Sequence, residues 1–168
     1  FGYFNVNQWF KLFDSMVKPI LCYGSHIWGY KYSTEIEFVQ HSFCSRFLGV
    51  KNSTNSCIVL GECGRLPLCV NYYKNCIKYW CKLLTMEDHR YPKRCYFMLK
   101  SFDNIGRITW ATHIKNLLFT YGFGYVLISH EIGDTNSFIR VFRKRLIDCF
   151  TQDWHRSVTE SSRCYHYK

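Results

Sequence analysis

The sequence predicts an all-α protein, an irregular bundle of about six helices with a kinked N-terminal helix and a long basic C-terminal helix. Apolar residues recur at steps of three and four along most of the 168 residues, which is the period of one helix face. Glycines, prolines and capping residues separate these runs. Aromatic residues make up 19% of the chain and charged residues 20%, a composition too apolar for a disordered protein. No apolar run reaches the roughly 18 residues of a membrane helix, so no membrane partner is expected.

The first helix is predicted from an apolar face that ends near residue 20. Pro19 lies inside this pattern, and a proline kinks or ends a helix because it cannot donate the main-chain hydrogen bond. Gly24 and Gly29 then interrupt the helical pattern. The apolar positions of this face are Trp9, Phe10, Phe13, Met16, Val17 and Ile20.

A second helix is expected to open at a capping box formed by Thr34 and Glu37 and to end at Gly49. Its predicted apolar face is Ile36, Val39, Phe43, Phe47 and Leu48. A short apolar piece, Cys57 to Leu60, follows and is closed by Gly61 and Gly64.

The clearest helical period runs from Val70 to Leu84, with Pro67 expected in the first turn of that helix. One face carries apolar residues and another carries lysines at a spacing of four. The predicted buried stripe is Tyr73, Cys76, Ile77, Trp80, Cys81 and Leu84, and the lysines are Lys74, Lys78 and Lys82.

Three further helices and one ambiguous segment complete the predicted bundle. A short helix is expected over residues 93–102, and another runs from Trp110 to Tyr121 and ends at Gly122. Residues 123–132 fit either a strand or a turn of helix. Asp134 or Asn136 is expected to cap the last helix, whose apolar positions are Phe138, Phe142, Leu146, Cys149, Phe150 and Trp154. The predicted division is 1–66 and 67–168, and one continuous domain fits the same pattern.

The net charge of +10, from 22 Lys and Arg against 12 Asp and Glu, favours a polyanionic partner. Nucleic acid is the first candidate because basic and aromatic residues are interleaved. A solvated basic surface is the alternative. The basic residues concentrate in three places: first Arg140, Arg143, Lys144 and Arg145, then Lys74, Lys78 and Lys82, then the loop with Arg90, Lys93 and Arg94.

Catalytic and metal-binding patterns are not found in the sequence. None of the twelve acidic residues lies in a Tyr-x-Asp-Asp setting, and the one adjacent pair, Glu87 and Asp88, fits a surface turn. The ten cysteines include no C-x-x-C pair, so no metal or cofactor is expected. They are interpreted as small buried apolar residues in a reducing compartment. A Cys–His enzyme is the least favoured alternative, and it would need an unusually reactive thiol.

Several segments resemble, in order, the region that follows the polymerase core in reverse transcriptases of non-LTR (LINE-like) retrotransposons. The first is residues 12–29, which is similar to LF-x-x-x-V-x-P-I-L-x-Y-G-S-x-x-W-G. The others are residues 36–44 (I-E-x-V-x-x-x-F-C), 47–50 (x-L-G-V), 61–68 (G-E-L-G-R-x-P-L), 77–80 (I-x-Y-W) and 145–154 (R-L-x-D-x-x-x-Q-x-W). His26 and Cys63 depart from the pattern, which usually has an acidic residue and a leucine there.

The resemblance implies an α-helical thumb and connector that grips template and primer beside a polymerase in the nucleus. It implies that this chain, which begins with Phe1 and lacks the polymerase aspartates, is a non-catalytic fragment. Magnesium would then be bound only by the missing core. Two alternatives remain: a structural or interaction domain that packs on the missing polymerase core, or a decayed element with no function. The sequence does not distinguish RNA from DNA as the preferred ligand.

Overall fold

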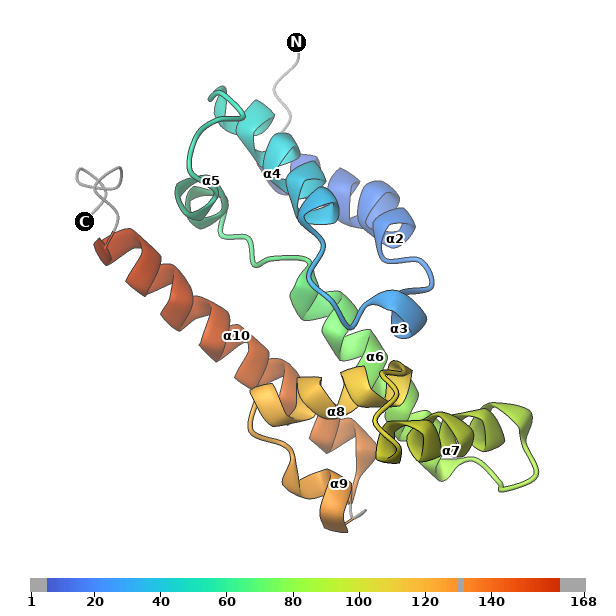
Figure 1. The fold of residues 1–168 in the computed structure, drawn as a ribbon. Coiled ribbons are helices and arrows are strands. Elements are labelled where there is room, and N and C mark those ends of the chain that lie inside the picture. Colours follow the sequence, from blue (N-terminus) through green and yellow to red (C-terminus); the bar gives the residue numbers. More distant parts are fainter. Residues whose placement is uncertain (1–5, 130–131, 161–168) are drawn as a thin grey trace. The chain divides into compact units, whose positions relative to one another are not determined.

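The computed structural model describes residues 6–129 and 132–160, and it is all-helical, with 75% helix and no strand among those residues. The predicted all-α class is therefore confirmed. The described residues form nine helices when the first three segments are counted as one run, rather than about six, because the sequence gives little signal for short helices. No described helix is both long and apolar enough to cross a membrane. The elements in Figure 1 are α1 (Val6–Leu12), η1 (Phe13–Val17), α2 (Lys18–Leu21), α3 (Ser25–Trp28), α4 (Thr34–Leu48), α5 (Ser56–Glu62), α6 (Cys69–Thr85), α7 (Tyr91–Asn104), α8 (Trp110–Thr120), α9 (Tyr125–Ser129) and α10 (Thr135–Glu160).

The described residues pack into two compact units. The first unit contains residues 6–23, 33–68 and 150–160. The second contains residues 24–32, 69–129 and 132–149. The predicted boundary between residues 66 and 67 lies two residues before one of the points where the chain passes from one unit to the other. Whether 1–66 and 67–168 fold separately stays a prediction.

A π-helical turn, η1, precedes Pro19 in the first helical run. The main-chain N–H of Lys18 donates to the carbonyl of Phe13, five residues back. Proline has no N–H, and its ring would clash with the carbonyl four residues before it, so a wider turn at this point suits the proline. The run then continues to Leu21 instead of ending at Pro19. The predicted kink stays a prediction.

Helix α4 differs from its prediction at its start and on its buried face. Ser33, not Thr34, is the N-cap, and its side chain accepts a hydrogen bond from the N–H of Ile36 at 3.4 Å. The predicted ending is confirmed, because Gly49 has a φ of 68° at the C-cap, which favours glycine. Val39, expected in the apolar face, is 38% exposed. The buried residues of α4 are instead Glu37, Gln40, His41, Cys44 and Ser45.

Aromatic rings from α1 and η1 pack against α4 in the first unit. Trp9 stacks on Phe43 with 4.9 Å between ring centroids, and Phe13 lies 4.7 Å from the same ring. Phe10 lies 5.2 Å from Phe47. On the face that the sequence assigned to the first helix, Phe10 and Phe13 are buried and Trp9 and Val17 are half-buried, whereas Met16 and Ile20 are 61% and 76% exposed.

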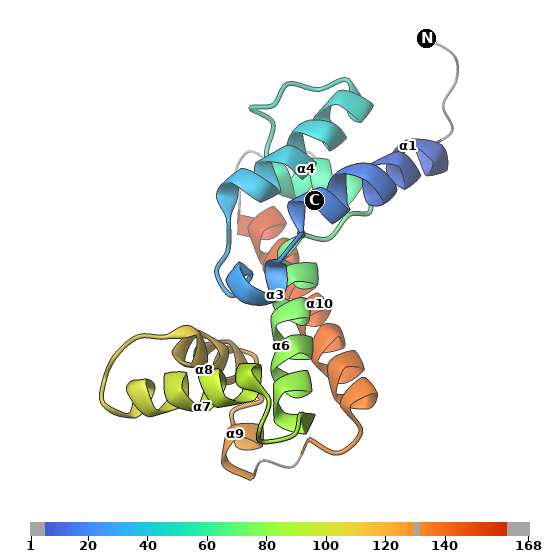
Figure 2. The same cartoon turned by 90° about the vertical axis from the view of Figure 1, so that its right-hand side faces the viewer.

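Helix α6 provides the core of the second unit, where α7 and α8 lie side by side next to it (Figure 2). The predicted stripe is confirmed except at its end, where Leu83 is buried and Leu84 is half-buried. Helix α6 begins at Cys69, so Pro67 precedes it and the predicted place of that proline was wrong. Short helix α3 packs on α6 through Gly29, where a Cβ would lie 2.8 Å from the Cβ of Tyr72.

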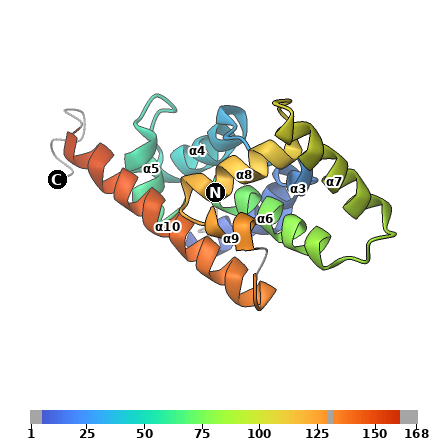
Figure 3. The same ribbon diagram turned by 60° about the horizontal axis from the view of Figure 1, so that its bottom comes forward.

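The remaining elements of the second unit follow α6. Helix α7 begins at Tyr91, two residues earlier than predicted, because Pro92 occupies its first turn. Helix α8 matches its predicted range, and Gly122 follows with a φ of 83°. Within the ambiguous segment, α9 covers Tyr125–Ser129, and residues 130–131 lie outside the described ones. Asp134 rather than Asn136 caps α10, since its carboxylate accepts a hydrogen bond from the N–H of Ser137 at 2.8 Å. Figure 3 has α8, α9 and the first turns of α10 next to one another.

Candidate nucleic-acid interface

The first turns of α10 carry the densest group of cations. Phe138, Phe142 and Leu146 are buried, and they recur at four-residue steps on one face. Arg140 and Lys144 are exposed on the opposite face by helical spacing, while Arg143 and Arg145 are exposed on the two flanks. The amphipathic pattern therefore orients these cations towards solvent. We call Arg140, Arg143, Lys144 and Arg145 the α10 cation group.

The α10 cation group is not neutralised by carboxylates in the part of the chain that the structure describes. No ion pair joins Arg143, Lys144 or Arg145 to another described residue, although the helix also carries Asp148 and Asp153. Arg140 acts weakly on Asp134. The pKa of Asp134 lies below its ordinary value mainly because Ser137 donates hydrogen bonds to the carboxylate, and the charge of Arg140 adds to this effect. The group can therefore offer its charge to an external anion.

The predicted lysine stripe of α6 divides into two kinds of side chain. Lys78 and Lys82 are exposed, one turn apart. Lys74 is half-buried and interacts with neighbouring groups of the protein. Like charges at this spacing repel by roughly 0.2–0.5 kcal/mol per pair, a cost that an anion would remove. Two of the three lysines are thus accessible to a ligand.

In the third predicted site, Lys93 stabilises the chain's own turn. Its ammonium donates to the carbonyl of Leu84 at 3.3 Å and to that of Met86 at 2.6 Å, at the end of α6. It also pairs with Asp88 at 2.8 Å, and this hydrogen bond lowers the pKa of that carboxyl. Arg90 and Arg94 are exposed. The sequence could not reveal the role of Lys93, because it depends on the path of the loop.

All ten predicted binding residues belong to the second unit, on or beside α6, α7 and α10. The structure does not gather them into one group. The first turn of α7, beside Arg90 and Arg94, lies away from the start of α10 in Figures 1 to 3. The α10 cation group is the one that combines density, exposure and lack of internal partners among the described residues.

Metal-ligand and nucleophile geometry was also sought among the described residues. No group of three His, Cys, Asp or Glu side chains could hold a metal ion there. Glu87 and Asp88 are exposed, as predicted for a surface turn, and are paired with His89 and Lys93. Burial raises the pKa of the Cys44, Cys76 and Cys81 thiols to about 12, so these thiols are protonated at neutral pH. Four of the nine described cysteines are buried and four are half-buried, whereas Cys95 is exposed, so the predicted burial is confirmed only in part.

The sequence interpretation missed an ion-pair centre in the first unit. Arg65 donates two hydrogen bonds to Asp14, at 2.8 Å and 2.5 Å, and Lys18 lies 3.6 Å from the same carboxylate. The guanidinium also lies over the rings of Phe10 and Phe13, at 5.3 Å and 5.7 Å from their centroids. The pKa of Asp14 is lowered, first by the hydrogen bond from Arg65. Residue spacing gives no signal for a pair 51 positions apart.

A second missed contact joins α5 to the end of α10. The indole N–H of Trp154 donates to the carbonyl of Cys57 at 2.7 Å, and the indole ring lies directly over Gly61. A Cβ at Gly61 would lie 2.9 Å from the ring. Gly61 is therefore part of α5 and a packing site rather than the end of the apolar piece, as the sequence predicted.

No protein-family model, no curated protein and no solved structure matches this chain.

Proposed function

We propose that this chain binds nucleic acid without catalysis, as the thumb and connector region of a reverse transcriptase of the non-LTR retrotransposon type. The observation that carries the proposal is the α10 cation group. It is exposed, opposite a packed apolar face, and without ion pairs to the described residues at Arg143, Lys144 and Arg145. Its natural ligand is the phosphate backbone of a template–primer duplex.

The contacts between resembling segments support the same proposal. Asp14, from the first segment, pairs with Arg65, from the fourth. Gly61, also from the fourth segment, packs under Trp154, from the last. Residues that carry the resemblance therefore meet in pairs and hold the first unit together. This is expected if the segments belong to one inherited fold.

The proposed mechanism is electrostatic. Each phosphate that an Arg or Lys side chain neutralises releases condensed counterions, so affinity falls linearly with salt on a logarithmic plot. The slope is about 0.9 per phosphate contacted on duplex DNA. These contacts hold the duplex without reading its sequence. The catalytic magnesium ions and aspartates would belong to the polymerase core, which is the partner expected within the same parent protein in the nucleus.

The decisive measurement is duplex affinity as a function of salt for the chain and for a triple variant, Arg143→Glu, Lys144→Glu and Arg145→Glu. The variant is expected to bind every duplex sequence more weakly and to lose roughly three units of slope, one per phosphate contact.

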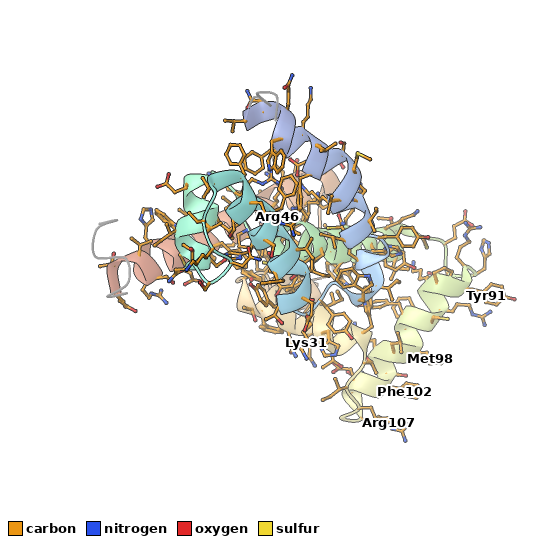
Figure 4. All side chains as sticks on the ribbon, turned by 90° about the horizontal axis from the view of Figure 1, so that it is seen from above. Lys31, Arg46, Tyr91, Met98, Phe102 and Arg107 are labelled. Atoms are coloured by element: carbon orange, nitrogen blue, oxygen red, sulfur yellow. The ribbon has the colours of Figure 1, made fainter. Side chains whose placement is uncertain are left out.

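A second triple variant controls for net charge. Lys11→Glu, Arg46→Glu and Lys51→Glu make the same change in net charge at exposed positions of the first unit, where Arg46 is labelled in Figure 4. This control is expected to keep most of the affinity and its slope. Equal loss in both variants would assign binding to net charge alone and reject the α10 cation group.

A second candidate function is favoured by an apolar stripe on the first helical run. Leu12, Met16 and Ile20 are 44%, 61% and 76% exposed at steps of four, and Tyr23, in the turn after α2, is 85% exposed. Large apolar side chains in a row on one face mark an interaction surface. The occupant would be the missing polymerase core, which makes this an interaction domain.

The two candidates respond differently to substitution of the stripe. Met16→Asp with Ile20→Asp is expected to reduce self-association of the isolated chain in sedimentation velocity, because it removes exposed apolar surface. Duplex affinity should stay unchanged if the α10 cation group carries binding. A concentration-independent monomer before substitution would reject the interaction candidate.

A further inference from the structure

Helix α7 has one packed side and one open side. On the packed side, the hydroxyl of Tyr96 accepts a hydrogen bond from the indole N–H of Trp80 at 2.9 Å, and Asp103 pairs with Lys115 of α8 at 2.5 Å. On the open side, Tyr91 and Met98 are 81% and 50% exposed. The helix is therefore covered by its own unit along one face only.

The open side is a regular ridge of apolar residues. Tyr91, Met98, Phe102 and Ile105 lie at steps of seven, four and three, which keeps them on one face of the helix. Ile105, directly after the helix, is 69% exposed. Figure 4 shows Tyr91, Met98 and Phe102 following one another along the outer edge of α7, with Arg107 beyond them. We call Tyr91, Met98, Phe102 and Ile105 the α7 ridge.

Cations flank the α7 ridge, while the acidic groups near it are already paired. Arg94 is exposed on the same face, and the guanidinium of Arg107 lies 5.7 Å from the centroid of the Phe102 ring. Asp88 pairs with Lys93, and Asp103 pairs with Lys115, whose hydrogen bond lowers the pKa of that carboxyl. The charge available to a partner at this face is therefore positive.

We propose that the α7 ridge is a docking surface for an amphipathic helix whose apolar face is flanked by Glu and Asp. The partner's apolar face covers Met98 and Ile105, and its acidic flanks reach Arg94 and Arg107. Met98 and Ile105 are aliphatic, so they offer apolar contact area and no ring on which a nucleic-acid base could stack. Phe102 is half-buried and already contacts Arg107, which leaves Tyr91 as the one exposed ring of the ridge. A second copy of the same ridge would bring cations of equal sign together, so self-pairing is disfavoured. This docking surface does not depend on the proposed nucleic-acid function.

The test uses the full chain and a labelled synthetic helical peptide of about 20 residues, long enough to hold a helix in water. Its apolar positions repeat at three and four residues, and its flanks are Glu. A second peptide has the same apolar face with Lys flanks. Fluorescence anisotropy is expected to show binding of the Glu-flanked peptide at least about tenfold tighter than that of the Lys-flanked peptide.

Substitutions separate the apolar contribution from the charge. Met98→Lys raises the positive charge yet removes ridge area, so it is expected to weaken binding of the Glu-flanked peptide about tenfold. Val6→Lys, a matched change at an apolar position of the first unit that is 51% exposed, should leave the affinity unchanged. Arg94→Glu is expected to reverse the preference towards the Lys-flanked peptide. Circular dichroism checks that each variant keeps its helix content.

Four outcomes would overturn the docking proposal. Equal affinity for both peptides would remove the charge argument, and unchanged binding by Met98→Lys would remove the ridge. If a single-stranded oligonucleotide displaced the peptide, and Met98→Lys abolished this competition, the ligand of the ridge would be nucleic acid. If the chain were a dimer that Met98→Lys converts to a monomer, the ridge would bind a second copy of the chain. None of these results depends on the α10 cation group.

Discussion

The second unit contains most of the buried apolar side chains of the described residues, whereas all but one of their buried polar side chains belong to the first. In the second unit, α6 places Tyr72, Ile77 and Trp80 at 1% exposure or less. In the first unit, Glu37, Gln40 and His41 are buried and hydrogen-bond the main chain of distant residues. The comparison teaches that apolar burial stabilises one unit, while the other relies more on specific polar contacts. Single substitutions should therefore change the free energy of unfolding by different amounts in the two units.

The largest expected loss of stability comes from a substitution in the apolar core of the second unit. Trp80→Ala removes an indole that is 1% exposed and leaves the Tyr96 hydroxyl without its donor. A loss of about 3–5 kcal/mol in the free energy of unfolding is expected from the cavity and the lost burial. Urea unfolding followed by far-UV circular dichroism measures it. Tyr91→Ala, at an 81% exposed position, should change the same quantity by less than about 0.5 kcal/mol.

A smaller loss of stability is expected in the first unit, at the close contact between Gly61 and the Trp154 ring. Gly61→Ala places a methyl group 2.9 Å from the Trp154 ring and displaces it, so the hydrogen bond to Cys57 weakens. We expect a loss of about 1–3 kcal/mol. Combining Gly61→Ala with Trp154→Leu should cost less than the sum of the two single changes, because the smaller side chain leaves room for the methyl group. Strict additivity in thermal unfolding would show that the ring and the glycine do not interact.

The ion pair of Arg65 should contribute less, since the carboxylate of Asp14 is partly exposed and solvent screens the charge. Arg65→Ala is expected to cost about 1–2 kcal/mol near pH 7 through the lost hydrogen bonds and ring contacts. The folded-state pKa of Asp14 is lowered, so this contribution is present above its ordinary value of 3.8 and is lost as pH falls through the folded value. The stability difference between the two proteins should therefore shrink in acid. A constant difference from pH 7 to pH 2 would assign the effect to packing alone.

The least invasive experiment sharpens the comparison without any substitution. The thiol of Cys44 reports on the first unit, and those of Cys76 and Cys81 report on the second. Burial raises all three pKa values to about 12, so a mild alkylator at neutral pH should modify them only after local opening. Cys95 is exposed and should react first. In rising urea, mass spectrometry is expected to find Cys44 modified before Cys76, and the reverse order would contradict the comparison.

The sequence predicted the all-α class and the buried stripe of α6, because that helix has a strong apolar period that its packing satisfies. It was right only in part on α4, where Phe43 and Phe47 of the predicted apolar face pack in the core but Val39 is exposed. The fully buried side chains of that helix lie on another face, which includes Glu37, Gln40 and His41. Loops 50–55 and 63–68 supply the main-chain partners of Glu37, Gln40 and His41, the polar row of α4. Local residue spacing does not reveal which loops fold back onto a helix. The short helices α3 and α9 lack the length that gives a clear period.

The cations of the candidate site could be predicted from the sequence because charge density is a local property. Their accessibility to a ligand could not be predicted in this way. Lys93 and Arg94 are adjacent and equally basic, yet one is bound to carbonyls at the end of α6 while the other is exposed. Arg65 lies within one of the resembling segments, but the sequence did not predict its structural role, because its partner Asp14 is distant in the chain. Long-range pairing, rather than residue type, separates structural cations from those available to a ligand.

The polar row on α4 has a consequence for how that helix sits in its own unit. An apolar seam tolerates rotation or a one-turn slide, because one methyl group can replace another. The amide of Gln40 must meet the Leu66 carbonyl, and the carboxylate of Glu37 must meet the Leu68 N–H, so only one phase of the helix satisfies both. Any other rotation of the helix would leave these buried polar groups without hydrogen-bond partners, at a cost of about 1–3 kcal/mol each. The two hydrogen bonds therefore fix both the rotation and the axial position of α4. They also fix the direction in which the chain leaves the end of that helix.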